Sequence, residues 1–159
     1  MKVSIDIDDP SWLAIDNLER LAQRIADHCA RAVDFGAEPS EATILFSDDE
    51  TVAALNRTWR GKHGPTNVLS FPSTLGVRAP DAPRHVGDIA LAFGVVAREA
   101  TEQEKSLAAH VSHLLVHGLL HLAGLDHMND AEAEVMEARE TEILGGLGIA
   151  DPYISEVRP

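Results

Sequence analysis

The chain has a single cysteine, Cys29, and aromatic residues make up only 4% of its 159 positions. One cysteine excludes both an intramolecular disulfide framework and a zinc site built from several cysteines. Because Cys29 lies on an apolar helical stripe, we expect a reduced thiol in the core, which suits the cytoplasm. No repeat or low-complexity linker divides the sequence, so its length predicts one domain over residues 1–159.

Positive charge is also scarce: 13 Lys and Arg face 26 Asp and Glu, and the net charge is −13. This balance argues against a protein that coats nucleic acid non-specifically. Residues 57–84 nevertheless hold five basic residues and one acid, whereas residues 130–142 hold six acids and one base. The basic strip is compatible with a polyanionic substrate or with an ordinary solvated loop. The acidic segment forms either a solvated helix face or a binding surface for a basic protein.

Residues 106–125 contain no Asp, Glu, Lys or Arg. Twenty such residues are long enough to span a bilayer. However, the run contains four histidines at helical intervals, at positions 110, 113, 117 and 121. We therefore expect a buried helix with one functional face and no membrane partner.

The remaining patterns interleave strands with helices. Alternating or β-branched runs predict strands over 3–7, 43–46, 68–71 and 88–93. Apolar spacing predicts a helix over 12–33, and a capping box that begins at Ser47 predicts another helix to about Arg57. The segment after residue 93 is predicted to be helical, with breaks at Gly124 and again after Leu144. The class is therefore α/β or α+β, with a small sheet that carries helices on its faces.

The most informative segment runs from His117 to His127 with the sequence HGLLHLAGLDH. His117 and His121 are four residues apart, so they share one helix face and can chelate one ion, with Zn–N distances of ~2.0–2.1 Å. Gly124 can end the helix in a left-handed conformation and return the chain, so that His127 closes the site. This pattern predicts one Zn²⁺ ion on three histidines, with water in the fourth position.

The same spacing occurs in the metzincin peptidase motif H-E-x-x-H-x-x-G-x-x-H. Here Gly118 stands where those peptidases carry the glutamate that acts as general base. Hydrolysis would then need a metal-lowered water pKa or a base from another segment. Asp126 can orient a ligand imidazole, accept a proton or cap the turn. We expect His110 and His113 to pack or to bond to the ligands.

The histidine motif resembles the signature of the YbeY family of bacterial endoribonucleases and rRNA maturation factors. Four further blocks carry the likeness: Leu55-Asn56 with Arg60-Gly-Lys62, Thr66-Asn67-Val-Leu-Ser-Phe-Pro72, Gly87-Asp88-Ile89, and Glu140-Thr-Glu-Ile-Leu144 with Asp151-Pro-Tyr153. The family usually has an aspartate where this chain has Asn67. If that carboxylate orients a ligand histidine, the hydrogen bond that orients this histidine is weaker here. If the carboxylate only caps a turn, the replacement has little effect on the site.

The resemblance implies a mixed sheet of about four strands surrounded by helices, and a metal, usually assigned as zinc, on His117, His121 and His127. It also implies a functional arginine at Arg60 and a cytoplasmic role in small-subunit rRNA 3′-end maturation and ribosome quality control.

Three hypotheses follow. The first is a metal-dependent endoribonuclease that cleaves single strands, in which Arg60 stabilises transition-state charge and Asp126 is a candidate proton acceptor. The second is a non-catalytic, metal-stabilised binding factor of ribosome assembly. The third, opposed by Gly118, is a metallopeptidase.

Overall fold

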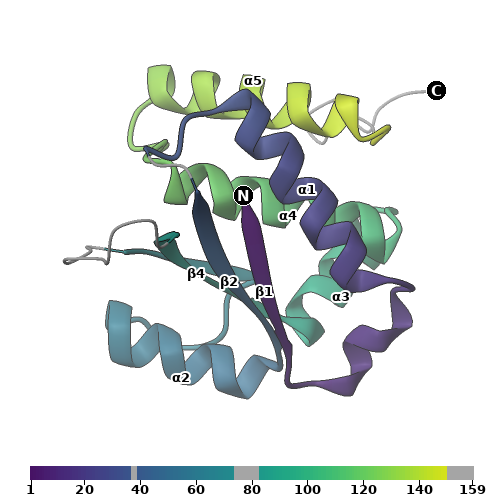
Figure 1. Ribbon diagram of the computed structural model, residues 1–159. Helices are drawn as coiled ribbons and strands as arrows, with labels where there is room; N and C mark the ends of the chain where they lie inside the picture. Colours follow the sequence, from purple (N-terminus) through teal and green to yellow (C-terminus); the bar gives the residue numbers. More distant parts are fainter. Residues whose placement is uncertain (37–38, 74–82, 150–159) are drawn as a thin grey trace.

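The computed structural model describes residues 1–36, 39–73 and 83–149 (Figure 1). Its four-stranded sheet has the order β1-β2-β4-β3. The strands are β1 (Lys2–Ile7), β2 (Ser40–Ser47), β3 (Val68–Pro72) and β4 (Arg84–Ala92). The first two and β4 run parallel, and β3 pairs antiparallel with β4. The predicted small mixed sheet is confirmed.

Helices cover both faces of this sheet. They are the 3₁₀ helix η1 (Pro10–Ala14), α1 (Leu18–Ala32), α2 (Asp49–Arg60), α3 (Phe93–Glu102), α4 (Leu107–Leu122) and α5 (Asp130–Gly146). Figure 1 shows α2 on one side of the sheet and α1, α4 and α5 on the other. Successive strand residues point to opposite faces, so Ile44 and Phe46 enter the main core while Leu45 packs with Val52 of α2.

The uncharged run forms α4, whose buried residues include His110, Gly118 and a series of leucines and valines. It lies between the sheet and the helices α1 and α5, so it is a core helix. No helix among the described residues is long and apolar enough to cross a membrane. Cys29 is a free, buried thiol, as predicted, and burial raises its pKa to about 12.

Two helix starts differ from the sequence prediction. The pattern over 12–33 is interrupted, because Asn17 adopts a left-handed conformation (φ 54°) and α1 begins only at Leu18. Trp12 causes this separation: its indole Nε1 donates to the carbonyl of Ser47 at 2.8 Å, and its ring packs against the core. An indole with a buried N–H needs a fixed acceptor, and apolar periodicity does not register that requirement.

The second helix is capped one residue later than predicted. Ser47 belongs to β2, and its hydroxyl donates to Asp8 at 2.9 Å. The N-cap is Asp48, whose carboxylate accepts from the Thr51 N–H at 2.7 Å. Pairing of β2 through Ser47 holds that residue in the sheet, so the next residue with a short acceptor side chain caps the helix.

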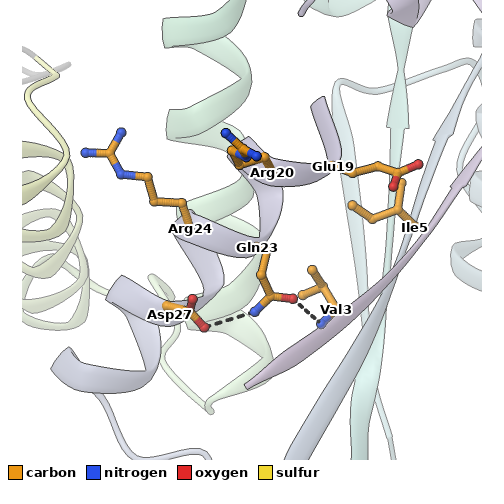
Figure 2. Close-up of a pocket in the computed structure, with 7 residues that line it drawn as sticks. All are labelled: Val3, Ile5, Glu19, Arg20, Gln23, Arg24 and Asp27. Carbon is orange, nitrogen blue, oxygen red and sulfur yellow. Dashed lines mark hydrogen bonds between the residues drawn. The ribbon is translucent and has the colours of Figure 1, made fainter. Parts of the chain in front are cut away.

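The free edge of β1 faces α1 across a groove of about 600 Å³. Figure 2 shows Gln23 reaching from α1 toward this edge. Its Oε1 accepts from the Val3 N–H at 3.1 Å, and its Nε2 donates to the Met1 carbonyl at 2.7 Å and to Asp27 at 2.9 Å. The Gln23 amide therefore satisfies edge groups of β1 that a neighbouring strand would otherwise pair.

Candidate metal centre

The structure brings His117, His121 and His127 together. The first two lie near the end of α4, and His127 lies in the turn before α5. One ring nitrogen of each lies within 4.8 Å of those of the other two. The Nε2 atoms of His117 and His121 are 3.1 Å apart. The ring centroid of His127 is 5.5 Å from that of His117 and 5.1 Å from that of His121.

The end of α4 places the third histidine. Gly124 takes a φ of +100°, the left-handed region that favours glycine, and the Leu125 N–H returns to the carbonyl of Leu120 at 3.0 Å. Asp126 Oδ1 then accepts from the backbone N–H of His127 at 2.8 Å. The predicted helix, turn and return are therefore present, and Asp126 makes the turn-capping contact that the sequence left open.

Hydrogen bonds fix which ring nitrogens face the centre. His117 Nδ1–H donates to Glu140 Oε1, and His121 Nδ1–H donates to the carbonyl of Leu125, each at 3.0 Å. A carbonyl or an ionised carboxylate only accepts, so in each neutral ring the proton sits on Nδ1. With both rings neutral and Glu140 ionised, both Nε2 atoms carry lone pairs, and these two atoms lie 3.1 Å apart.

This arrangement fits a cation between the rings. Two nitrogens bound at ~2.0–2.1 Å to one tetrahedral zinc ion lie ~3.3 Å apart, close to the observed separation. Burial, followed by the neighbouring His117 and His127, lowers the pKa of His121, which keeps its ring neutral and its lone pair available at neutral pH. The three histidines can therefore hold one divalent ion.

Glu140 is the site residue that sequence reasoning missed in this role. Its side chain is buried, and its Oε1 accepts from His117 Nδ1 and from His113 Nε2 at 3.1 Å. A carboxylate behind a ligand histidine fixes the ring and raises its basicity. A signal was available: Glu140 lies at helical spacing among the buried Met136 and Ile143, where an acid needs a specific partner.

His110 belongs to a different network. It is 3% exposed, and its Nε2 lies 2.8 Å from Glu99 Oε1. Asn67 Nδ2 donates to the same carboxylate at 3.0 Å, and Asn67 Oδ1 accepts from the Val68 N–H. These contacts direct Asn67 toward Glu99 and its own strand. A carboxylate at position 67 would face Glu99, and the amide removes that repulsion.

The three histidines lie in a pocket of about 850 Å³ between the end of α2, β3 and the end of α4. Its lining residues include Asn56, Arg60, Lys62, Asn67, Ser70, His113, His117, His121, Asp126, His127 and Met128. The guanidinium Nη2 of Arg60 donates to the Ser70 carbonyl at 2.7 Å, and its Cζ lies 5.7 Å from the centre of the Phe71 ring. Arg60 and Asp126, both singled out from the sequence, thus share one pocket with the histidines.

The predicted basic strip does not stay together. Arg60 and Lys62 line the pocket, and Arg57 lies one turn earlier on α2. Arg84 instead starts β4 and donates to the carbonyl of Phe35. Arg78, Asp81 and the block 151–153 lie outside the described residues.

Gly118 faces the sheet at close range. Its carbonyl accepts from the Ser70 hydroxyl at 3.3 Å. A Cβ at this position would lie 3.0 Å from Ser70 Oγ and 3.1 Å from Ile89 Cδ1. A larger residue at this position, such as the glutamate of the peptidase motif, would therefore require Ser70 and Ile89 to shift.

The "Endoribonuclease YbeY" family model matches residues 5–148. A protein of that name from Paramagnetospirillum magneticum is 49% identical, with 96% of each chain covered. Another from Allorhizobium ampelinum is 44% identical over 99% of this chain and 97% of the relative. The solution structure of a Thermotoga maritima protein has a TM-score of 0.56 at 20% identity and covers 96% of this chain and 99% of its own, which shows a shared fold. The chain belongs to the endoribonuclease YbeY family.

Proposed function

We propose that this protein is a metal-dependent endoribonuclease that cleaves single-stranded RNA with one zinc ion held by His117, His121 and His127. The observation that carries the proposal is the pair of converging Nε2 lone pairs in a pocket whose wall bears Arg60. A bare cation site would suit many functions. A cation site beside an arginine and a lysine suits a phosphodiester, because these residues bind its negatively charged oxygens.

The metal and two basic residues of the pocket have separate roles in this mechanism. When bound, the metal supplies Lewis acidity to a phosphoryl oxygen or to a water that it holds. Arg60, held by the Ser70 carbonyl and the Phe71 ring, uses its remaining N–H groups to stabilise charge on the phosphoryl group in the transition state. Lys62 binds a backbone phosphate without reading sequence.

Two carboxylates, Glu140 and Asp126, hold or accept protons in this mechanism. Glu140 holds the proton on His117 Nδ1, which keeps the opposite nitrogen free for the metal. Asp126, positioned by its bond to the His127 N–H, takes the proton of the attacking hydroxyl. Both water and the RNA 2′-hydroxyl are compatible with this assignment.

The cellular role that we propose is small-subunit rRNA 3′-end maturation and ribosome quality control in the cytoplasm, with residues 1–159 acting as one domain. Support comes from the names of the relatives and from the family resemblance. The acidic surface of α5, which includes Glu134, Glu137 and Glu142, is a candidate contact for a basic ribosomal protein.

The test is cleavage of single-stranded ribosomal RNA by the native protein and by His121→Ala, purified in parallel. His28→Ala serves as the matched control, because His28 lies on α1 away from the pocket. We expect cleavage by the native protein and the control only, lost on chelation and restored by zinc. Equal cleavage by His121→Ala would contradict the proposal.

The binding-factor alternative is favoured by the acidic face of α5. It predicts that ribosome co-sedimentation survives His121→Ala and that no variant cleaves RNA. The peptidase alternative predicts chelator-sensitive hydrolysis of a quenched peptide library, and the packing around Gly118 opposes it.

A further inference from the structure

One of the two tryptophans of this chain is placed in solvent. Trp59 is 69% exposed, whereas Trp12 is fully buried. Exposing an indole forgoes a large hydrophobic gain, since aromatic side chains bury 150–250 Å² each in ordinary cores. The exposed indole is therefore available to a partner outside the chain.

The exposed Trp59 lies in the last turn of α2. Val52 and Asn56 are the buried residues of this helix, and Trp59 continues their stripe toward the end of the helix. Trp59 is three residues after Asn56 and one before Arg60, and both of these line the metal pocket. Residues three apart are neighbours on a helix surface, so the indole lies beside Asn56 at the rim of the pocket, outside the residues that line it.

The surroundings of Trp59 are positively charged. Arg57, Arg60 and Lys62 are exposed, and none has an ion-pair partner among the described residues. The acids of α2, Asp49 and Glu50, lie in its first turn at the opposite end. The helix dipole accounts for cations in the last turn, but it does not account for an exposed indole beside them.

We propose that Trp59 is a stacking platform for a nucleobase of the single-stranded RNA, just outside the metal pocket. The inference rests on the proposed function, because it assigns one substrate contact of the same site. In this arrangement Arg60 and Lys62, which line the pocket, hold the phosphates next to a base whose flat face lies on the indole. Stacking on an aromatic ring tolerates any base, so Trp59 adds affinity and fixes the path of the strand without selecting a sequence.

The two tryptophans make the experiment direct. The probe is a short single-stranded oligoadenylate with 2′-O-methyl riboses, and emission is followed during titration at low salt. A base stacked on Trp59 quenches its fluorescence, while Trp12 stays shielded by its contacts with Phe46, Phe93 and the Ser47 carbonyl. We expect saturable quenching in the native protein and none in Trp59→Phe, whose remaining tryptophan is Trp12.

Affinity is then measured by anisotropy of a labelled probe. Base–aromatic stacking is worth ~1–3 kcal/mol, so we expect Trp59→Ala to bind about tenfold more weakly and Trp59→Phe to retain most of the affinity. Leu13→Ala is the matched control, because Leu13 is 65% exposed but lies in η1 near β1, at the edge of the sheet opposite β3. It should bind as the native protein does.

An abasic oligomer with the same number of phosphates completes the design. It should bind the native protein and Trp59→Ala equally. An equal loss on the abasic and the adenine oligomers, or unchanged affinity of Trp59→Ala for the adenine oligomer, would overturn the proposal. Failure of the nuclease proposal is separate: stacking without cleavage by the native protein leaves Trp59 as a binding residue. If Trp59→Ala both cleaves RNA and binds the probe normally, the stacking proposal is wrong and the nuclease proposal is unaffected.

Discussion

Two hollows of this molecule have similar size and opposite chemistry. The groove between β1 and α1 measures about 600 Å³, and the pocket below the end of α4 about 850 Å³. In the groove, Gln23 satisfies the edge of β1 and also bonds to Asp27 (Figure 2). In the pocket, two histidine lone pairs converge on one point.

The comparison distinguishes a groove that is a by-product of packing from a pocket whose side chains are arranged to bind a ligand. In the groove, Gln23 bonds to the backbone of β1 and to Asp27, and the lining holds two arginines and two acids, Glu19 and Asp27. Nothing there requires a ligand. In the pocket, Glu140 and the Leu125 carbonyl use up the outer nitrogens of the ligand histidines and force the inner ones toward a cation.

The largest expected effect is removal of a ligand. His121→Ala should abolish stoichiometric metal binding, since two remaining imidazoles form a weak and incomplete site. Metal content after purification in zinc and extensive dialysis measures this. Arg24→Ala in the groove is the control and should keep its metal. If His121→Ala still retained one tightly bound zinc per chain, the histidines would not be the feature that distinguishes the pocket from the groove.

Gly118→Glu should come next in size. The new side chain would enter the contact between α4 and the sheet, where an uncompensated buried charge costs about 3–5 kcal/mol. Urea unfolding measures the free energy. Gly145→Glu is the control, because a Cβ at that position meets nothing within 4 Å, and it should be near neutral. Normal stability of Gly118→Glu would show that the helix–sheet contact can open to admit a peptidase-like base.

Glu140→Gln should weaken metal affinity about 10- to 100-fold, because the ring behind it loses a charged acceptor. A competition titration with a chelating dye measures the affinity. Glu134→Gln, on the exposed face of the same helix, should leave it unchanged. Equal affinities for both variants would mean that Glu140 serves only the packing of α5.

Gln23→Ala should have the smallest effect and should act on stability alone. Losing the bonds to Val3 and Met1 at a partly exposed edge should cost about 1 kcal/mol of unfolding free energy, with metal binding unchanged. Thermal unfolding of the metal-free and metal-loaded protein measures both. A change in metal affinity would show that the two hollows are coupled through α1.

The sequence predicted the course of the chain through the histidine motif better than the boundaries of the elements around it. Spacing alone placed His117, His121 and the Gly124 turn correctly, because they are local properties of one helix and its end. The predicted start of α1 was wrong by several residues, and the contact of the Trp12 indole with Ser47 that precedes this helix is tertiary. The predicted cap of α2 was wrong by one residue, because the pairing of Ser47 in the sheet is also a tertiary contact. Glu140 was seen as part of a motif but not as a partner of His117.

Local patterns in the sequence were enough to predict the shared helical face of His117 and His121, the turn at Gly124 and the lack of a peptidase glutamate, whereas the mixed sheet followed only from the family resemblance. Which atoms face one another follows instead from how distant segments pack. The contact of His117 Nδ1 with Glu140 and the direction of the Arg60 guanidinium, set by Ser70 and Phe71, depend on groups far apart in the chain. Hydrogen bonds and burial act over a few ångströms in space, and sequence spacing carries that information only within one element.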